Sequence, residues 1–127
     1  MLVPFVNIDS YIFINENWKN RINGKEILMI RKNRNIDNRC NFITGGVDLN
    51  RNYSFKFGLD NIGSSNNPCE EDYRGTKPFS EPEIRSIKEL LVMNKSIISN
   101  INFHTYGNAW LYPYNFIHDK NDNLLHK

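Results

Sequence analysis

The sequence predicts an α/β fold, a partial mixed β-sheet with one flanking helix. Short apolar runs are separated by polar connections, as is typical of buried strands, and one segment has clear helical periodicity. The order of strand, long loop, helix and strand is an α/β arrangement, in which functional sites gather at the carboxyl ends of strands. The chain shows no internal repeat and no domain boundary, so we expect residues 1–127 to belong to one domain.

The first half of the chain predicts two strands and a long loop. The apolar run Leu2–Val6 reads as a buried strand that ends at a turn over Asn7–Ser10, and a second apolar run, Ile27–Ile30, precedes the basic stretch Arg31–Arg34. The connection from Asn35 to Pro78 is rich in Gly, Asn, Ser and Pro. A connection this long is usually functional or disordered, and its aromatic residues favour an ordered loop that builds a site.

The clearest element is a helix from about Glu81 to Asn94. Ser80-Glu81-Pro82-Glu83 has the form of a capping box, in which Ser80 caps free backbone N–H groups and Glu83 reaches back. Pro82 is tolerated in the first turn. Apolar residues then follow helical spacing, at Ile84, Ile87, Leu90, Leu91, Ile97 and Ile98.

Two further strands are expected after this helix. Ile97–Phe103 resumes a strand-like pattern and delivers His104 at its carboxyl end. Ala109–Tyr114 is another apolar and aromatic run. The carboxyl end of the expected strand Ile97–Phe103 therefore places His104 where a functional site is expected.

Composition argues against two classes of partner, and a small basic nucleic-acid module that uses Arg31–Arg39 is only a weak alternative. The chain has 16 Lys+Arg against 14 Asp+Glu, a formal charge of +2, which gives no electrostatic case for nucleic acid or a membrane surface. No apolar run approaches the ~20 residues needed to span a bilayer. The segment Met1–Phe13 has neither a basic leader nor a small-residue cleavage site, so it is not predicted to be a signal peptide.

Four local features could carry chemistry, and each has an ordinary structural interpretation when taken alone. His104 suits a packing residue, Arg31 a solvated turn, and Tyr106 a surface aromatic. Asn50-Arg51-Asn52, which follows Gly45-Gly46-Val47-Asp48-Leu49, suits a turn whose Asp and Asn side chains bond to the local backbone. Their joint order along the chain favours a functional interpretation over these separate ones.

Five ordered segments together resemble the zinc metallocarboxypeptidases of the carboxypeptidase A/B type. They are Asn7-Ile8-Asp9-Ser10-Tyr11, Arg31-Lys32-Asn33-Arg34, Gly46-Val47-Asp48-Leu49-Asn50-Arg51-Asn52-Tyr53, Tyr73-Arg74-Gly75 with Phe79-Ser80-Glu81-Pro82-Glu83, and Phe103-His104-Thr105-Tyr106-Gly107 with Leu111-Tyr112-Pro113-Tyr114. The G-V-D-x-N-R-N string is the most specific of them. The resemblance runs from about Leu2 to Phe116 and implies the central part of the zinc-carboxypeptidase fold.

The resemblance implies a role for each matched residue. His104 matches the third zinc ligand, and Arg31 matches the arginine that polarises the scissile carbonyl and stabilises the oxyanion. Asn50 and Arg51 match the pair that holds the free carboxylate at the C-terminus of a peptide or protein substrate. Thr105 and Tyr106 match positions that line the cleft. The implied activity is zinc-dependent release of C-terminal amino acids.

The two cysteines, Cys40 and Cys69, are far apart and not in a CxxC arrangement, which excludes a zinc ribbon. The residues alone leave two alternatives open, one disulfide or two unrelated buried thiols. The resemblance implies a disulfide, because both fall where some secreted family members carry one. A disulfide would indicate an oxidising, extracellular compartment.

A catalytic zinc needs about three protein ligands and an open position, and the family takes the other two from an H-x-x-E motif that this sequence lacks. The family's general-base Glu falls beyond Lys127. We therefore expect a partial peptidase domain, with its upstream and downstream parts absent, that has no meaningful activity alone and self-associates through exposed apolar surface. The alternative is a non-catalytic binding or scaffold protein that holds a C-terminal carboxylate.

Two Asn-x-Ser sequences have the form of N-glycosylation acceptors, Asn52-Tyr53-Ser54 and Asn94-Lys95-Ser96. The chain contains 21 Asn residues, so such matches arise readily by chance. Asn52 also lies within the G-V-D-x-N-R-N string, which makes it the less suitable acceptor of the two.

Overall fold

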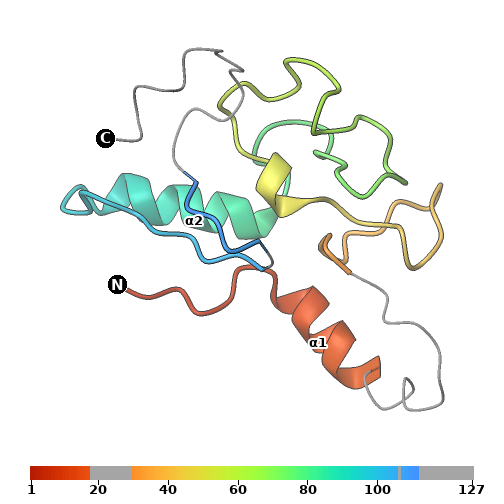
Figure 1. Cartoon of the computed structure of the whole chain (residues 1–127), viewed down its shortest axis with the longest axis horizontal. Coiled ribbons are helices and arrows are strands. Elements are labelled where there is room, and N and C mark those ends of the chain that lie inside the picture. Colours follow the sequence, from red (N-terminus) through yellow and green to blue (C-terminus); the bar gives the residue numbers. More distant parts are fainter. Residues whose placement is uncertain (18–29, 106, 112–127) are drawn as a thin grey trace. The chain divides into compact units, whose positions relative to one another are not determined.

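The computed structural model describes residues 1–17, 30–105 and 107–111. The chain divides into two compact units, Met1–Ile97 and Ile98–Lys127. The first unit contains helices α1 (Ile8–Asn17) and α2 (Pro82–Met93), with the short 3-10 turn η2 (Leu49–Arg51) between them in the chain (Figure 1). No described helix has the length and apolar character needed to cross a membrane. Because regular elements are few among the described residues, side-chain bonds to the backbone carry much of the structure of the first unit.

Helix α1 begins where the sequence predicted a turn, and that prediction is wrong. The side chain of Asn7 accepts a hydrogen bond from the backbone N–H of Ser10 at 3.4 Å, as an N-cap residue does, and Asp9 lies in the first turn. Ser10 is buried, and its hydroxyl donates to the backbone carbonyl of Lys32. Asn7 and Asp9 therefore start a helix and not a turn. The apolar run Leu2–Val6 before them forms no strand, and its side chains are exposed.

The predicted mixed sheet is not confirmed. The described residues contain no strand, only one isolated parallel bridge between Ser65 and Tyr73. Residues 98–105 and 107–111, which cover most of the two strands expected after α2, have exposed side chains. An apolar run becomes a strand only when a neighbouring strand pairs with its backbone. The predicted strand residues 27–29 and 112–114 lie outside the described residues.

Helix α2 confirms the predicted helix to within one residue at each end. It runs over Pro82–Met93, with Glu81 as N-cap and Asn94 as C-cap. Ile84 is 1% exposed, so the apolar stripe of the helix does face the interior at its start. Ile87 and Leu90 on the same face are half-buried.

The predicted capping box at the start of α2 is wrong. The N-cap is Glu81, and its side chain makes no capping bond. The hydroxyl of Ser80 instead donates to Glu81 Oε1 at 2.7 Å, and Glu83 Oε1 accepts from Asn33 Nδ2 at 3.2 Å. These side chains are drawn away from the helix terminus because a buried polar cluster offers them partners.

That cluster, which we call the asparagine cluster, consists of Asn33, Asn52 and Glu81, each no more than 2% exposed. Asn33 Nδ2 donates to Glu81 Oε2 at 2.7 Å, and Asn33 Oδ1 accepts from the backbone N–H of Val47 at 2.9 Å. Asn52 Oδ1 accepts from the backbone N–H of Glu81 at 3.1 Å. Two segments far from Glu81 in the sequence, around Asn33 and around Asn52, are thereby tied to the start of α2.

Asn52 also holds the chain that leads into α2. Its Nδ2 donates to the carbonyl of Arg74 at 2.8 Å, to the carbonyl of Lys77 at 3.2 Å and to Ser80 Oγ at 2.8 Å. Its backbone carbonyl accepts from the N–H of Phe79 at 2.7 Å. Since a buried polar group without a partner costs about 1–3 kcal/mol, this side chain contributes strongly to the loop conformation.

Two glycines allow the chain to pass close to this cluster. Gly46 has φ +106°, and a Cβ there would lie 2.0 Å from the carbonyl oxygen of Asn33. Gly75 has φ +86°, and a Cβ there would lie 2.7 Å from Asn52 Nδ2. Both the backbone angle and the lack of space therefore require glycine.

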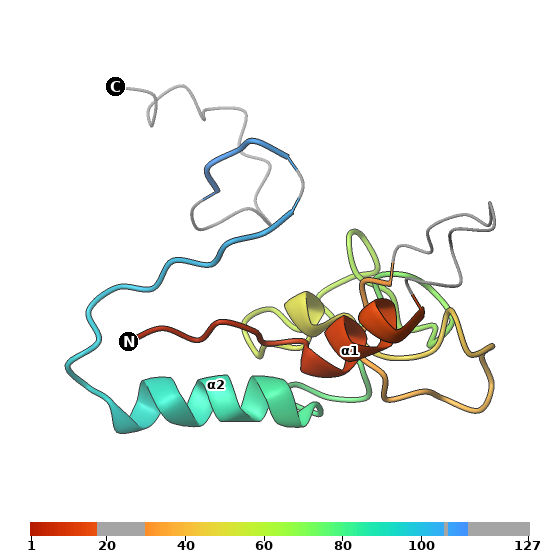
Figure 2. The same cartoon turned by 90° about the horizontal axis from the view of Figure 1, so that it is seen from below.

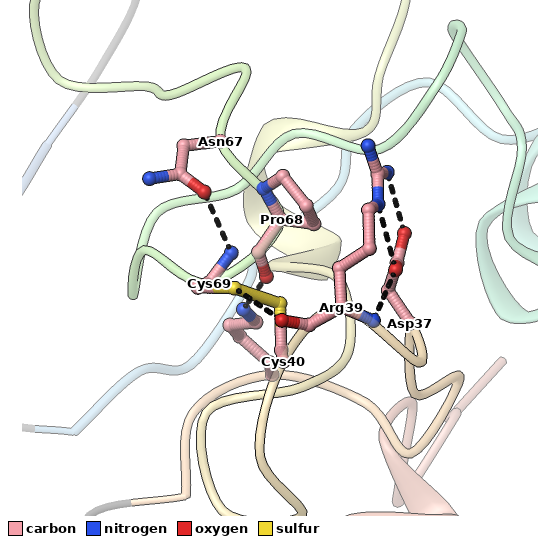
Figure 3. A network of polar contacts seen from close by, with 7 residues as sticks. Asp37, Arg39, Cys40, Asn67, Pro68 and Cys69 are labelled. Carbon is pink, nitrogen blue, oxygen red and sulfur yellow. Dashed lines mark hydrogen bonds and ion pairs between the residues drawn. A yellow bond between two sulfur atoms is a disulfide. The ribbon is translucent and has the colours of Figure 1, made fainter.

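The long connection is ordered and is closed by a disulfide between Cys40 and Cys69, whose Cα atoms are 5.2 Å apart (Figure 3). Asn67 Oδ1 accepts from the backbone N–H of Cys69 at 3.1 Å. The buried ammonium group of Lys32 donates to the carbonyls of Pro68 at 2.7 Å and Glu70 at 2.9 Å, on either side of the bridge. The disulfide and the lysine thus fasten the same stretch of loop.

Candidate functional site

The site begins with Asp48, which builds the turn η2. Asp48 is 2% exposed and is the N-cap of η2, where its Oδ1 accepts from the backbone N–H of Asn50 at 3.0 Å. Its own backbone N–H donates to the carbonyl of Tyr73 at 2.8 Å. The turn is therefore fixed both by its cap and by the second half of the long loop, and it presents Asn50 and Arg51 from a defined backbone.

One carboxylate oxygen of Asp48 lies between two arginines. Arg31 Nε donates to Asp48 Oδ2 at 2.7 Å, and Arg51 Nε lies 3.9 Å from the same oxygen. The side chains of Arg31 and Arg51 are 40% and 33% exposed. Arg51 Nε is buried and has no hydrogen-bond partner among the described residues. Two guanidinium groups around one carboxylate leave a local charge of +1 at a partly exposed place.

The structure brings three of the predicted site residues together in the first unit, namely Arg31, Asn50 and Arg51. Asn50 is exposed and directly precedes Arg51 on η2. The contacts of Arg31 and Arg51 with Asp48 use Nε, so the terminal Nη groups of the two guanidinium groups are not needed for them. An anion with two oxygen atoms suits such donors, because a guanidinium can meet both oxygens at once.

The remaining predicted site residues belong to the second unit. His104 and Thr105 are exposed there, and Tyr106 lies outside the described residues. Within the part of the chain that the structure describes, no three His, Cys, Asp or Glu side chains come together to hold a metal ion. His104 is thus without companion ligands among these residues, and they do not make up a zinc site.

Sequence reasoning missed the role of Asp48. It gave this residue a local turn bond, which the structure has, but did not foresee the ion pairs with Arg31 and Arg51. The sequence did contain a sign of these ion pairs, because Asp48 is the single acidic residue in a string that also holds Arg51. A buried carboxylate needs a cationic or hydrogen-bonding partner. The arginine that supplies most of that partnership is 17 residues away in the sequence.

The three basic side chains of the stretch Arg31–Arg34 all contact other parts of the chain. Arg31 binds Asp48, and Lys32 binds backbone carbonyls. The guanidinium of Arg34 lies 4.3 Å from the ring centroid of Phe13 and 4.5 Å from that of Phe42. A stretch that reads as a basic cluster in the sequence therefore has three separate local roles.

Burial shifts the pKa of several groups near the site. It lowers the pKa of Lys32, an effect that the nearby carboxylates of Glu71, Asp48, Glu70 and Asp72 oppose. It raises the pKa of Tyr73 and of Tyr53. Burial also lowers the pKa of Arg34.

Comparison with known proteins gives a consistent result. A family model described as zinc carboxypeptidase matches residues 1–125. Carboxypeptidase B2 of Rattus norvegicus is 36% identical over 123 residues, covering 94% of this chain and 26% of the relative. Carboxypeptidase B of Astacus astacus is 40% identical over 78 residues, covering 61% of this chain and 25% of the relative. The chain spans about a quarter of the length of these curated relatives.

The solved structures agree. A structure of bovine thrombin-activatable fibrinolysis inhibitor in complex with tick carboxypeptidase inhibitor is similar to this chain with a TM-score of 0.53 and 35% sequence identity. The similarity covers 73% of this chain and 27% of that one. The likeness therefore extends to the path of the chain even though the described residues form no strand.

Proposed function

The chain belongs to the zinc carboxypeptidase family, and from this premise we propose that Asn50 and Arg51 bind the free carboxylate at the C-terminus of a peptide or protein. The observation that carries the proposal is the arrangement around Asp48. A buried carboxylate lies beside Arg31 and Arg51, and the partly exposed guanidinium groups keep a net positive charge. A carboxylate ligand would balance that charge and meet the planar donors of Arg51.

Arg31 has a separate role in this proposal. Its bond to Asp48 at 2.7 Å fixes the guanidinium near the carboxylate-binding residues, and 40% of its side chain is exposed. A permanently charged group held in place stabilises negative charge that develops on a carbonyl oxygen without having to reorganise. We assign it the polarisation of the scissile carbonyl of the bound peptide.

Hydrolysis in this family is expected to require zinc. When bound, zinc would polarise a carbonyl and activate water. The described residues do not fit it, because only His104 stands at a position that resembles a ligand and no group of three ligating side chains exists among them. We therefore derive no hydrolytic step from this chain. His104 as ligand, with Thr105 and Tyr106 as cleft residues, remains a proposal for the peptidase domain of which this chain would be a part.

The second candidate function is retention of a C-terminal carboxylate without hydrolysis. The same Asp48–Arg51 geometry favours it, because binding needs no metal. For either function, the disulfide between Cys40 and Cys69 supports an oxidising, extracellular compartment.

Carboxylate binding is tested by calorimetric titration of the 127-residue chain with an N-acetylated amino acid and with the amide of the same compound. We expect the acid to bind and the amide not to bind. Arg51→Ala should weaken binding of the acid about 10- to 100-fold, because a charge-assisted hydrogen bond contributes ~1.5–3 kcal/mol. Arg39→Ala is the matched control, since Arg39 is an exposed arginine paired with Asp37 and not with Asp48. Equal affinity for acid and amide would overturn the proposal.

The two candidate functions differ in one further measurement. The chain is incubated with a peptide that has a free C-terminus in the presence of zinc, and the released amino acid is quantified. We expect no release by this chain alone. Steady release that a chelator stops would favour the hydrolytic function and refute simple retention.

A further inference from the structure

Two Asn-x-Ser sequences lie toward opposite ends of helix α2, and the structure separates them. Asn52 contacts the N-cap residue Glu81, whereas Asn94 is the C-cap residue. The helix between them has 12 residues, which corresponds to roughly 18 Å along its axis. In Figures 1 and 2 the turn η2, which precedes Asn52, lies nearer to the first turns of α2 than to its last.

Asn52 is unsuitable as an acceptor of carbohydrate. Its side chain is fully buried, its amide nitrogen donates to Ser80 Oγ, and its carbonyl oxygen accepts from the backbone N–H of Glu81. A glycan on Nδ2 would have to pass through the chain around Arg74 and Lys77. The folded structure therefore leaves no room for a modified Asn52.

Asn94 is in the opposite situation. Asn94, Lys95 and Ser96 are all exposed, and the helix has ended, so the acceptor lies at the start of an irregular segment. Asn94 Nδ2 donates one hydrogen bond, to the carbonyl of Leu90 at 2.7 Å. An amide nitrogen carries two hydrogens, so one can be replaced by a sugar while the other keeps this bond.

We propose that Asn94 is an N-glycosylation site. The donor would be an oligosaccharide linked to a polyprenyl diphosphate. In the transfer, a bond forms between Asn94 Nδ2 and the anomeric carbon of the sugar, and the bond from that carbon to the diphosphate oxygen breaks. Nδ2 loses one proton, and the lipid diphosphate leaves with the electron pair. The Cys40–Cys69 disulfide supports the proposal independently, because disulfides form in the compartment where such donors are used.

The test is secretion of the full chain from a eukaryotic host behind a cleavable leader, followed by intact mass measurement before and after treatment with a peptide N-glycosidase. We expect a carbohydrate mass that the enzyme removes and that peptide mapping assigns to Asn94. Ser96→Ala should abolish this mass, because it destroys the acceptor sequence and leaves Asn94 itself in place. Ser96 is exposed, so this change should not disturb folding.

Ser54→Ala is the matched control. Ser54 is exposed and completes the other acceptor sequence, so its loss removes that sequence while the buried Asn52 keeps its bonds. We expect the carbohydrate mass to be unchanged in this variant. A secreted chain with the disulfide formed and Asn94 unmodified would overturn the proposal, as would carbohydrate at Asn52. Neither readout depends on binding of a C-terminal carboxylate.

Discussion

The side chains around η2 and those around His104 are held in very different ways. In the first unit, Asp48 and Asn52 are almost fully buried and bond to segments that lie before and after them in the sequence. In the second unit, the described residues 98–105 and 107–111 all have exposed side chains. Both regions carry a sequence pattern of the same family, yet among the residues that the structure describes, only those of the first region are buried and hydrogen-bonded in this way.

The difference shows what kind of motif can fold locally. The string around Asp48 supplies its own partners, because Asp48 caps the turn that contains Asn50 and Arg51. The run before His104 is an expected strand, and a strand depends on backbone partners from another segment. The position of a residue on such a turn is therefore set by nearby residues. The position of a residue at the end of a strand depends instead on the other strands of the sheet.

The largest effect is expected from Asn52→Ala. This change leaves the N–H of Glu81 and the carbonyls of Arg74 and Lys77 without the partner that Asn52 supplies, which we expect to cost roughly 3–9 kcal/mol at about 1–3 kcal/mol for each of the three groups. Such a loss is comparable with the whole stability of many domains. Thermal unfolding followed by circular dichroism should show a lost or strongly lowered transition.

Asn50→Ala is the control for this change, since Asn50 belongs to the same turn but is exposed. Its unfolding free energy should change by less than about 0.5 kcal/mol. If Asn52→Ala melted like the unchanged chain, the asparagine cluster would not be what holds the first unit together.

Removal of the disulfide should have the next largest effect. Cys40 and Cys69 are 29 residues apart, and closing a loop of this length stabilises a chain by roughly 3–4 kcal/mol in the chain-entropy description. A Cys40→Ser, Cys69→Ser variant should unfold at a clearly lower urea concentration. Added reductant should lower the midpoint of the unchanged chain but not that of the variant. Equal midpoints for the two proteins would mean that Lys32 and its carbonyl partners suffice to hold the loop.

A smaller, pH-dependent effect is expected at the exposed pair of Asp37 and Arg39. Hydrogen bonds from Arg39 lower the pKa of the Asp37 carboxyl from 3.8 to about 2. Because the folded pKa is the lower one, the contribution to stability is present above pH 3.8 and is lost as the pH falls through about 2. An NMR titration of Asp37 measures this pKa, and Arg39→Ala should raise it toward the ordinary range, because the side-chain hydrogen bonds are lost while the backbone N–H of residue 39 still donates to Asp37. An unchanged titration in the variant would contradict the assignment to Arg39.

The smallest effect is expected at His104. Its side chain is exposed, so His104→Ala should change the unfolding free energy by less than about 0.5 kcal/mol. Ile84→Ala, at a position 1% exposed, is the contrasting variant and should lose about 2–5 kcal/mol. Substantial destabilisation by His104→Ala would show that the second unit is packed more firmly in solution than its exposed side chains indicate.

Sequence reasoning predicted the helix α2 well because its signals are local. Apolar residues at helical spacing and Pro82 in the first turn are sufficient to locate it. The helix α1 was missed because Asn7–Ser10 was interpreted as a turn, whereas the side chain of Asn7 caps the start of a helix. The capping box failed because Ser80 and Glu83 have competing partners, Asn52 and Asn33, that are distant in the sequence.

The candidate site was predicted in the same uneven way. Arg31, Asn50 and Arg51 could be named from their order along the chain, and the structure brings them together. The carboxylate that joins Arg31 to Arg51 could not be inferred from spacing, because the ion pair depends on how the long loop folds back. The partners of His104 are not found among the described residues, so its predicted role as a ligand remains untested.

Lys32 gives the molecule an internal reporter of its own folded state. The residue is 4% exposed, and its amine donates to backbone carbonyls on both sides of Cys69. A reagent that acylates amines in water reaches exposed lysines such as Lys95 at once but reaches Lys32 only when the loop opens. The rate of labelling at Lys32 therefore measures how often the loop around Cys69 opens.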